Sequence, residues 1–255
     1  MQDVSSHQTL AATLSFPVRA YEVGPSGRLS PLVLLDYLQE AAGVHARALG
    51  VEFPALPTGP GTWVLARLRV EIACLPEHGD EAVVETWPSD EDGLRAYRDS
   101  IVRDGAGAEL ARATTEWLVI DPARRRPARL PPDVLSISRP DRARALAPAV
   151  ELEPTAPAAV EAEDHFRVRR ADLDRVGHAN NVRFAEWALE GVPDAWADGH
   201  TLTAIDIRYR AEAVHGDTVR VEVGPGEKPG AFLHRLTRAA DGFLLALART
   251  SWTEP

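Results

Sequence analysis

One long segment near the start of the chain carries apolar residues at helical spacing. From Leu32 to Leu49, leucine, alanine and valine side chains recur every three or four residues along a broad face. Ser30 is a favourable N-cap, Pro31 suits the first helical position, and Gly50 suits the residue after the last turn. The pattern therefore predicts a long helix in the first half of the chain.

A second helical pattern begins after a polar stretch in the other half. The run from Val182 to about Ala197 places Phe184 and its apolar neighbours on or near one face. Asn180 or Asn181 directly precedes this run, and either is a good N-cap. We therefore predict that each half contains one long helix.

Strand-like runs follow a repeated order in the two halves. The tripeptide His-Gly-Asp occurs twice, at His78–Asp80 and His215–Asp217, each time between two runs that read as strands. The predicted strands around these turns are Thr62–Ala73, Glu81–Thr86, Thr203–Arg210 and Thr218–Val223. An antiparallel sheet must bury one face, and one helix per half can cover it. The fold class predicted from this pattern is α+β, with two similar halves.

A proline-rich segment separates the halves. From Pro127 to about Glu163 no periodic pattern survives, and proline, alanine and aspartate are frequent. We interpret this segment as a linker. The predicted organisation is an N-terminal domain at 1–130, a linker at 131–162 and a C-terminal domain at 163–255.

Composition and charge restrict the class of partner. The 255 residues are 45% hydrophobic and 26% charged, which is ordinary for a globular protein, and the formal net charge is −10. Such a chain repels nucleic acid and anionic membranes on average, so neither is an expected partner. No apolar run is long enough to span a membrane, and no secretory signal is evident. Cys74 is the only cysteine, so we expect a cytoplasmic protein without an internal disulfide. We expect it to be a monomer or a homodimer.

The stretch before the second helix concentrates groups that carry acid–base chemistry. Within Asp172–Asn181 lie two carboxylates, one imidazole and two side-chain amides, and Gly177 argues against regular structure there. A polar loop at a helix N-terminus places acid–base groups beside a positive dipole end. No second histidine has the spacing of a metal site, so neither a metal nor another cofactor is expected. Of the remaining polar residues, Asp172 and Arg175 are interpreted as solvated loop.

Five segments together carry a resemblance to a known family: Tyr21–Gly50, TWVLARLRVEI (Thr62–Ile72), GDEAVVETWP (Gly79–Pro88), DLDRVGHANNVRFAEWALEGVP (Asp172–Pro193) and IDIRYRAEAVHGD (Ile205–Asp217). Through these segments nearly the whole chain resembles the acyl-acyl-carrier-protein thioesterases of bacteria and plants. The resemblance implies two tandem hotdog domains, each a long helix wrapped by an antiparallel sheet. It also implies Asp174, His178 and Glu212 as catalytic residues. Where the plant enzymes have an asparagine and a cysteine, this chain has Val176 and Ala213.

The resemblance assigns chemistry to the second half. Asp174 would act as a base toward water or as a nucleophile, His178 would position it or assist proton transfer, and Glu212 would orient or deprotonate the water. Asn180, Asn181 and Val176 would contact the substrate, and the amides suit an oxyanion. Each catalytic candidate also has a structural interpretation: a turn cap, a loop hydrogen bond and an ion pair with a neighbouring arginine.

The first half lacks these groups. Its corresponding place holds the sequence Gly-Pro-Ser-Gly-Arg at 24–28, so we expect this half to supply an apolar pocket for the acyl chain. The expected function is hydrolysis of a fatty acyl thioester on the phosphopantetheine arm of acyl carrier protein. Hydrolysis of acyl-CoA and a non-catalytic acyl-thioester-binding protein are the alternatives, and a hotdog hydratase is less favoured.

Overall fold

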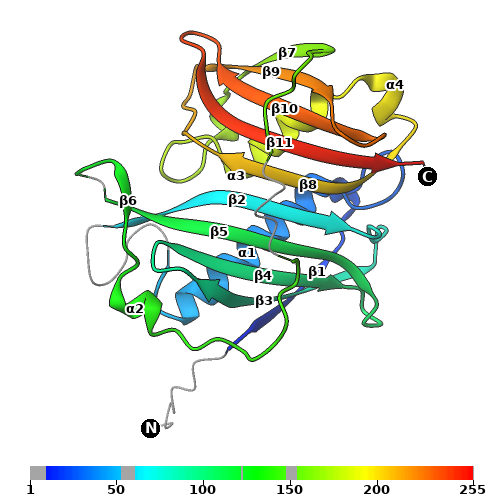
Figure 1. Ribbon diagram of the computed structural model, residues 1–255. Helices are drawn as coiled ribbons and strands as arrows, with labels where there is room; N and C mark the ends of the chain where they lie inside the picture. Colours follow the sequence, from blue (N-terminus) through cyan, green and yellow to red (C-terminus); the bar gives the residue numbers. More distant parts are fainter. Residues whose placement is uncertain (1–9, 53–60, 122, 148–153, 255) are drawn as a thin grey trace, which may run out of the picture. The chain divides into compact units, whose positions relative to one another are not determined.

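The computed structural model describes residues 10–52, 61–121, 123–147 and 154–254. The chain forms two compact units (Figure 1). Unit 1 comprises Met1–Leu65 and Leu75–Leu146, and unit 2 comprises Ala66–Cys74 and Ala147–Pro255. Strand β2 (Thr62–Ile72) therefore contributes its first residues to unit 1 and its remainder to unit 2.

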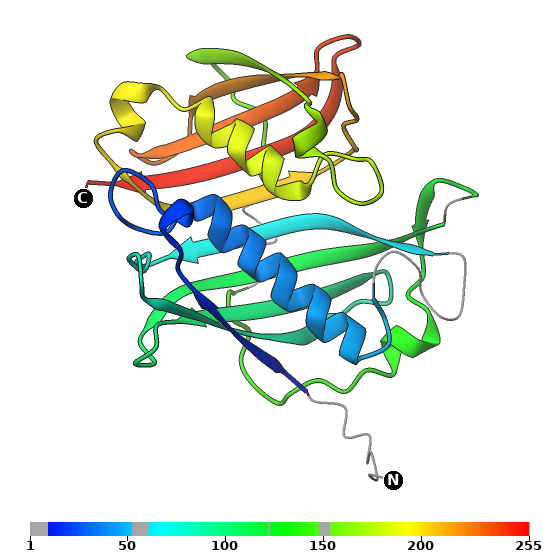
Figure 2. The same cartoon turned by 180° about the vertical axis from the view of Figure 1, so that it is seen from behind.

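Unit 1 is a helix on an antiparallel sheet. The strands are β1 (Ala12–Pro17), β3 (Glu81–Glu91), β4 (Arg95–Arg103), β5 (Glu109–Asp121) and β6 (Arg126–Ala128), paired in the order β1-β3-β4-β5-β6. A short 3-10 turn, η1 (Ala20–Glu22), leads from β1 toward helix α1 (Pro31–Ala48), which crosses one face of the sheet (Figure 2). The Ser30 hydroxyl accepts a hydrogen bond from the Leu32 N–H at 3.3 Å, as the predicted cap requires.

Unit 2 repeats this plan. Its strands are β7 (Ala162–Arg167), β8 (Thr201–Tyr209), β9 (Thr218–Pro225), β10 (Ala231–Arg238) and β11 (Phe243–Thr253), in the antiparallel order β8-β11-β10-β9-β7. The part of β2 that belongs to this unit pairs with β8. A second 3-10 turn, η2 (Arg170–Asp172), precedes helix α3 (Asn181–Glu190), which lies on this sheet. The predicted α+β plan of one helix wrapped by an antiparallel sheet is thus confirmed in each unit.

The second helix is shorter than predicted. The expectation of one helix to about Ala197 is wrong, because α3 ends at Glu190 and a separate turn, α4 (Asp194–Ala197), follows. Pro193 lies between them, and proline disfavours helical geometry in the residue before it. Gly191 also lies close to the Val221 and Val223 side chains, so the chain leaves the helix where it meets the sheet.

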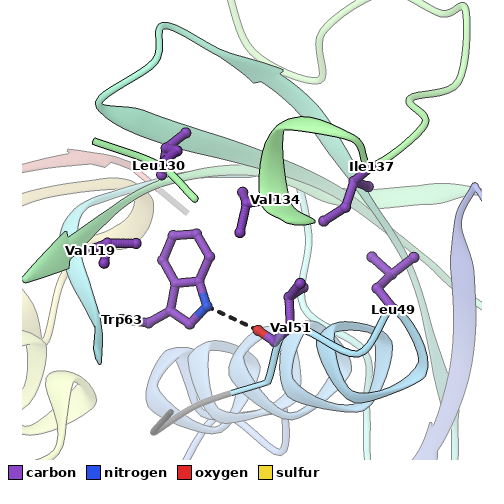
Figure 3. Packing of buried hydrophobic residues seen from close by; sticks show 7 residues of the cluster. All are labelled: Leu49, Val51, Trp63, Val119, Leu130, Val134 and Ile137. Carbon is purple, nitrogen blue, oxygen red and sulfur yellow. Dashed lines mark hydrogen bonds between the residues drawn. The ribbon is translucent and has the colours of Figure 1, made fainter. Parts of the chain in front are cut away.

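A cluster of buried residues forms part of the core of unit 1 (Figure 3). Its centre is Trp63, whose indole N–H donates to the Val51 carbonyl at 2.9 Å. Val134, on the short helix α2 (Pro132–Leu135), and Ile137 pack in the same cluster. The beginning of the segment interpreted as a linker is therefore part of the core of unit 1. Residues 148–153 of that segment lie outside the described residues.

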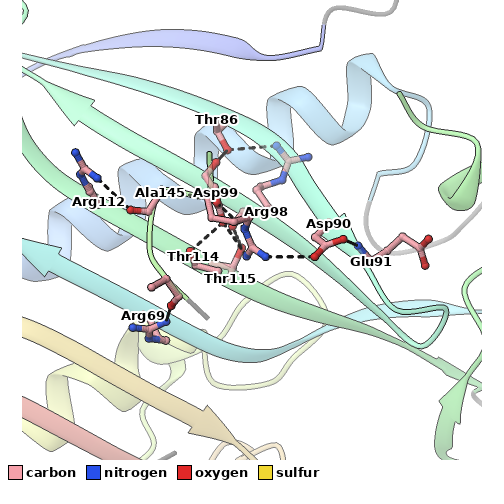
Figure 4. Close-up of polar contacts among 12 residues, drawn as sticks. Arg69, Thr86, Asp90, Glu91, Arg98, Asp99, Arg112, Thr114, Thr115 and Ala145 are labelled. Carbon is pink, nitrogen blue, oxygen red and sulfur yellow. Dashed lines mark hydrogen bonds and ion pairs between the residues drawn. The ribbon is translucent and has the colours of Figure 1, made fainter. Parts of the chain in front are cut away.

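The linker segment also covers the face of the unit 1 sheet that points away from α1. Asp99 on β4 is fully buried there, and its carboxylate accepts hydrogen bonds from the Arg144 side chain, the Ala145 N–H and the Thr114 hydroxyl (Figure 4). The Arg142 guanidinium lies 3.7 Å from the Trp87 ring centroid on the same face. We call residues 142–146 the strap.

Candidate active site

The polar stretch of unit 2 forms a tight hairpin that ends at the N-cap of α3. Its two sides are joined where the Asp174 N–H donates to the His178 carbonyl at 2.7 Å and the Asn180 N–H donates to the Asp172 carbonyl at 2.8 Å. Gly177 has φ +88°, a left-handed conformation that costs glycine little. We call residues 172–180 the unit 2 hairpin.

One of the two oxygens of the Asp174 carboxylate accepts hydrogen bonds from its own hairpin. Its Oδ1 accepts from the Val176 N–H at 2.9 Å and from the His178 N–H at 3.1 Å. Its Oδ2 accepts no hydrogen bond from any residue that the structure describes. The side chain is partly exposed. One oxygen is thus held in a fixed orientation while the other is available to a substrate or a water.

His178 and the segment that contains Glu212 lie side by side. His178 forms an isolated β-bridge with Val214, and the Ala179 N–H donates to the Ala213 carbonyl at 2.8 Å. The His178 imidazole forms no hydrogen bond within the described part of the chain, and Glu212 is exposed. The fold therefore brings these two segments together, although no hydrogen bond joins the Glu212 side chain to either Asp174 or His178 within the described ranges.

The three predicted substrate-binding residues have different surroundings. Asn180 is the N-cap of α3, since its Oδ1 accepts from the Val182 N–H at 3.0 Å. Asn181 is the first residue of the helix, and its carbonyl accepts from the Tyr209 hydroxyl at 3.1 Å. Val176 is exposed at the tip of the hairpin. The cap bond uses the Asn180 oxygen and leaves its NH₂ group as a donor at the start of the helix.

The interpretation of Asp172 as solvated loop is wrong. This residue is only 1% exposed. Its carboxylate accepts from the Arg169 backbone N–H at 2.6 Å and from the Arg169 Nη2 at 2.7 Å. Burial opposes ionisation, but these hydrogen bonds outweigh it and lower the pKa of Asp172. A signal for this role exists in the sequence, because arginine and a carboxylate also stand three residues apart at Arg19 and Glu22.

Unit 1 contains the same hairpin without the acid–base groups. The Gly24 N–H donates to the Arg28 carbonyl at 2.9 Å, and the Ser30 N–H donates to the Glu22 carbonyl at 2.8 Å. Gly27 has φ +75° at the place of Gly177. We call residues 22–30 the unit 1 hairpin. Where unit 2 has an aspartate and a histidine, this hairpin has Gly24 and Arg28.

The interior of unit 1 includes a polar cluster that the sequence did not indicate (Figure 4). The Arg98 Nη1 lies 3.0 Å from Nδ1 of His45, a fully buried residue of α1, and 3.3 Å from the Thr86 hydroxyl. Among the described residues no carboxylate lies within ion-pair distance of Arg98. Burial lowers the pKa of Arg98 to about 10, so it remains a cation at neutral pH. The space between helix and sheet in this unit is therefore not wholly apolar.

Unit 2 also buries an imidazole in its sheet. His234 on β10 is fully buried, and its Nε2 lies 2.9 Å from the Thr250 hydroxyl. Burial lowers the pKa of His234 to about 3, so it is neutral at neutral pH. His178, which is partly exposed, is the better candidate for proton transfer.

Within the described residues no helix is long and apolar enough to span a membrane.

A helix wrapped by an antiparallel sheet, present twice, with an acid–base hairpin at only one helix start, defines a tandem hotdog protein of the thioesterase class. Family comparison agrees: residues 10–138 match the acyl-ACP thioesterase N-terminal domain, and residues 155–254 match the acyl-ACP thioesterase C-terminal domain. The chain belongs to the acyl-ACP thioesterase family.

Individual relatives extend over most of the chain. The oleoyl-acyl carrier protein thioesterase 1, chloroplastic, of Arabidopsis thaliana is 29% identical over 93% of this chain and 74% of its own length. The oleoyl-acyl carrier protein thioesterase, chloroplastic, of Coriandrum sativum is 33% identical over 80% of this chain and 60% of its own length. The solved 12:0-ACP thioesterase from Umbellularia californica has a TM-score of 0.85 and 26% identity, covering 97% of this chain and 95% of that one.

A bacterial structure supports the fold alone. The acyl-ACP thioesterase from Bacteroides thetaiotaomicron has a TM-score of 0.83 at 23% identity, covering 95% of this chain and 98% of that one. The predicted family and fold class are thus confirmed. No side-chain role follows from these likenesses.

Proposed function

We propose that this protein hydrolyses the thioester of a fatty acyl chain on the phosphopantetheine arm of acyl carrier protein, releasing the free fatty acid and the carrier thiol. One observation carries the proposal. The unit 2 hairpin presents an aspartate with one fixed and one available carboxylate oxygen, beside an imidazole that makes no hydrogen bond in the described ranges. The names of the relatives support the substrate class.

Asp174 is the proposed base or nucleophile. With Oδ1 held by two backbone N–H groups, Oδ2 can take a proton from the attacking water, or it can attack the thioester carbon and form an acyl anhydride that water then hydrolyses. In either route the carbon–sulfur bond breaks, and His178, four residues on, would give a proton to the leaving thiolate and regain one from the water that is consumed. Glu212 would orient the attacking water from the adjoining segment. The oxyanion would be stabilised by the Asn180 NH₂ group and by the backbone N–H of Asn181, since the next two N–H groups of the helix already donate to Asn180.

Unit 2 is thus the proposed catalytic domain, and unit 1 the proposed site of the acyl chain. Two residues at the site bear on alternatives. Val176 is exposed and Ala213 is fully buried. Both side chains are hydrocarbons, so neither supplies an amide or a thiol. A protein without those groups fits weak or absent hydrolysis, which keeps a non-catalytic acyl-thioester-binding protein as the second candidate.

The test is thiol release from purified protein with acyl-ACP thioesters of several chain lengths, and with the matching acyl-CoA thioesters. The proposal expects release from acyl-ACP and near-complete loss in Asp174→Asn, which keeps a hydrogen-bond acceptor at Oδ1. Equal release by the variant would overturn the mechanism. A higher kcat/KM for acyl-CoA would replace the carrier substrate, and binding without release would favour the binding protein. Light scattering tests the proposed state of monomer or homodimer.

A further inference from the structure

We propose that Asp172 is a positioning residue, which, through Arg169, holds the hairpin that carries Asp174 in place on helix α3. The inference rests on the proposed function, since positioning matters for catalysis only if the hairpin is the active site. It concerns a residue whose own carboxylate is buried and bonded to Arg169.

The first step is the connection between Asp172 and both ends of the hairpin. Its carboxylate accepts from the Arg169 N–H at 2.6 Å and from the Arg169 Nη2 at 2.7 Å, which fixes the entering strand. Its carbonyl accepts from the Asn180 N–H at 2.8 Å, which fixes the leaving strand at the cap of α3. A shift of Asp172 therefore moves both sides of the hairpin.

The second step extends the connection to the helix. The Arg169 Nη2 lies 3.7 Å from Oε1 of Glu186 on α3, and the other oxygen of Glu186 is paired with Arg183. The hairpin is thus connected to a side chain within the helix as well as to the N-cap. We call Asp172 and Arg169 the unit 2 clamp.

The third step is the consequence of the clamp for the reacting groups. Most backbone hydrogen bonds of the hairpin are internal, the Ala179 N–H joins it to the Ala213 carbonyl, and its tip from Arg175 to Gly177 is exposed. Without the clamp, Asp174 and His178 would move with the hairpin relative to the helix N-terminus. Catalysis depends steeply on such placement, because a displacement of about 1 Å can cost roughly a hundredfold in rate.

Unit 1 supplies a matched control. There the Glu22 carboxylate accepts from the Arg19 N–H at 2.8 Å and from the Arg19 Nη1 at 2.9 Å, and its carbonyl holds the Ser30 N–H at 2.8 Å. We call Glu22 and Arg19 the unit 1 clamp. It secures the same kind of hairpin, but one without a carboxylate or an imidazole at the reacting places.

The experiment compares Asp172→Asn with Glu22→Gln. Each variant leaves a buried arginine-facing side chain without its charge, so each should lower the melting temperature. At a temperature where both are folded, Asp172→Asn should lower kcat for acyl-ACP thioesters by roughly tenfold to a hundredfold with little change in KM. Glu22→Gln should keep kcat within about twofold. Asp172→Glu should restore most of the kcat, since the unit 1 clamp shows that glutamate can make these bonds.

Hydrogen exchange gives a second measurement that does not depend on turnover. In Asp172→Asn the amides of residues 174–180 should exchange faster, with no change in residues 24–30, and Glu22→Gln should do the converse. Asp172→Glu should restore the protection. Unchanged exchange in Asp172→Asn, or an equal loss of kcat in Glu22→Gln, would overturn the inference. If the wild type releases no thiol from any thioester, the proposed function fails, while the exchange result still decides whether the clamp holds the hairpin.

Discussion

The unit 1 hairpin and the unit 2 hairpin have nearly the same backbone but different side chains. Corresponding hydrogen bonds close both, at 2.9 Å from Gly24 to Arg28 and at 2.7 Å from Asp174 to His178. Because glycine in unit 1 allows the same turn, the hairpin does not need a carboxylate at this place in order to fold. A side-chain acceptor for this turn comes from Ser26 in unit 1 and from Oδ1 of Asp174 in unit 2. The second oxygen of Asp174 has no such role among the described residues, and this is the physical reason to assign it chemistry.

The histidine place gives the same lesson. In unit 1, the Arg28 guanidinium donates to the Leu75 carbonyl at 2.7 Å and forms an ion pair with Glu77 at 3.1 Å, so it secures the neighbouring segment. A backbone bridge secures the segment in both units, from Arg28 to Glu77 and from His178 to Val214, but within the described residues the His178 side chain takes no part in such a tie. A polar side chain that the fold leaves without a structural task is available for a reaction.

The largest expected effect comes from making the unit 2 hairpin like its counterpart. Asp174→Gly should lower thiol release from acyl-ACP by roughly three orders of magnitude, because it removes the proposed base. The melting temperature should change by only a few degrees, since Gly24 supports the same turn. Enzyme assays and circular dichroism check both parts. Retained activity would mean that the two hairpins do not differ in function.

A smaller effect is expected from a side-chain contact below the unit 1 hairpin, between Tyr37 and Glu22. The Tyr37 hydroxyl donates to the buried Glu22 carboxylate at 2.7 Å. Tyr37→Phe should lower the free energy of unfolding by about 1–3 kcal/mol, because a buried charged group loses a donor. Urea denaturation measures it. The control is Tyr21→Phe, at a residue 80% exposed, for which a loss as large as in Tyr37→Phe would contradict the explanation.

The contact between Tyr37 and Glu22 also predicts how stability depends on pH. Burial opposes ionisation of Glu22, but hydrogen bonds from Tyr37 and Arg19 outweigh it, so its pKa lies below the ordinary 4.5. With the folded pKa below the unfolded one, the stabilisation is present above about pH 4.5 and is lost as the pH falls through the folded pKa. In Tyr37→Phe the folded pKa rises, so acid unfolding should begin at higher pH than in the wild type.

The two positive-φ glycines of the hairpins should respond alike. Gly27→Ala and Gly177→Ala each place a side chain in the left-handed region, at φ +75° and +88°, and should each cost about 1–2 kcal/mol of stability. Gly43→Ala, in the middle of α1 with open space around its α-carbon, should instead stabilise by about 0.5–1 kcal/mol. Guanidinium denaturation compares the three. Clearly unequal costs at the first two would show that the backbones differ more than their hydrogen bonds indicate.

The smallest effect concerns the side chain that accepts a hydrogen bond from the backbone N–H of Arg28 in unit 1 and of His178 in unit 2. In unit 1 the exposed Ser26 hydroxyl accepts from the Arg28 N–H at 3.3 Å, whereas in unit 2 the Asp174 carboxylate accepts from the His178 N–H. Ser26→Ala should lower the free energy of unfolding by less than about 0.5 kcal/mol, since the amide can bond to water instead. Thermal melts measure the change, and a loss above about 1 kcal/mol would show that the serine is essential to the turn.

Much of the fold could be predicted because its signals are local. Ser30 and Pro31 mark the start of α1, and the two His-Gly-Asp turns mark corresponding strands in both halves. Gly191 and Pro193 also indicate the end of α3, but the apolar pattern continues beyond them and predicts a longer helix. Periodicity alone does not register a helix break when the residues after it are still apolar.

The candidate site was predictable in part. The concentration of polar residues located the hairpin, and its place before a helix indicated acid–base chemistry. Its internal roles were not predictable from residue type, because Asp172 and Asp174 are two residues apart and have opposite surroundings. Which carboxylate is buried depends on the direction of each side chain relative to η2, which composition does not contain. The Arg98 contact with His45 likewise depends on the packing of α1 on β4.

The strap sets where unit 1 can be cut. A fragment that stopped at residue 130 would retain every strand and the long helix described for this unit, yet it would leave the buried Asp99 without Arg144 and the Ala145 N–H. It would also uncover Trp87 and Ile101, which pack with Ala145. A fragment that extends to Leu146 keeps these partners. For anyone who separates or recombines halves of such enzymes, the boundary of the first module is therefore defined by a carboxylate and its arginine rather than by the last strand.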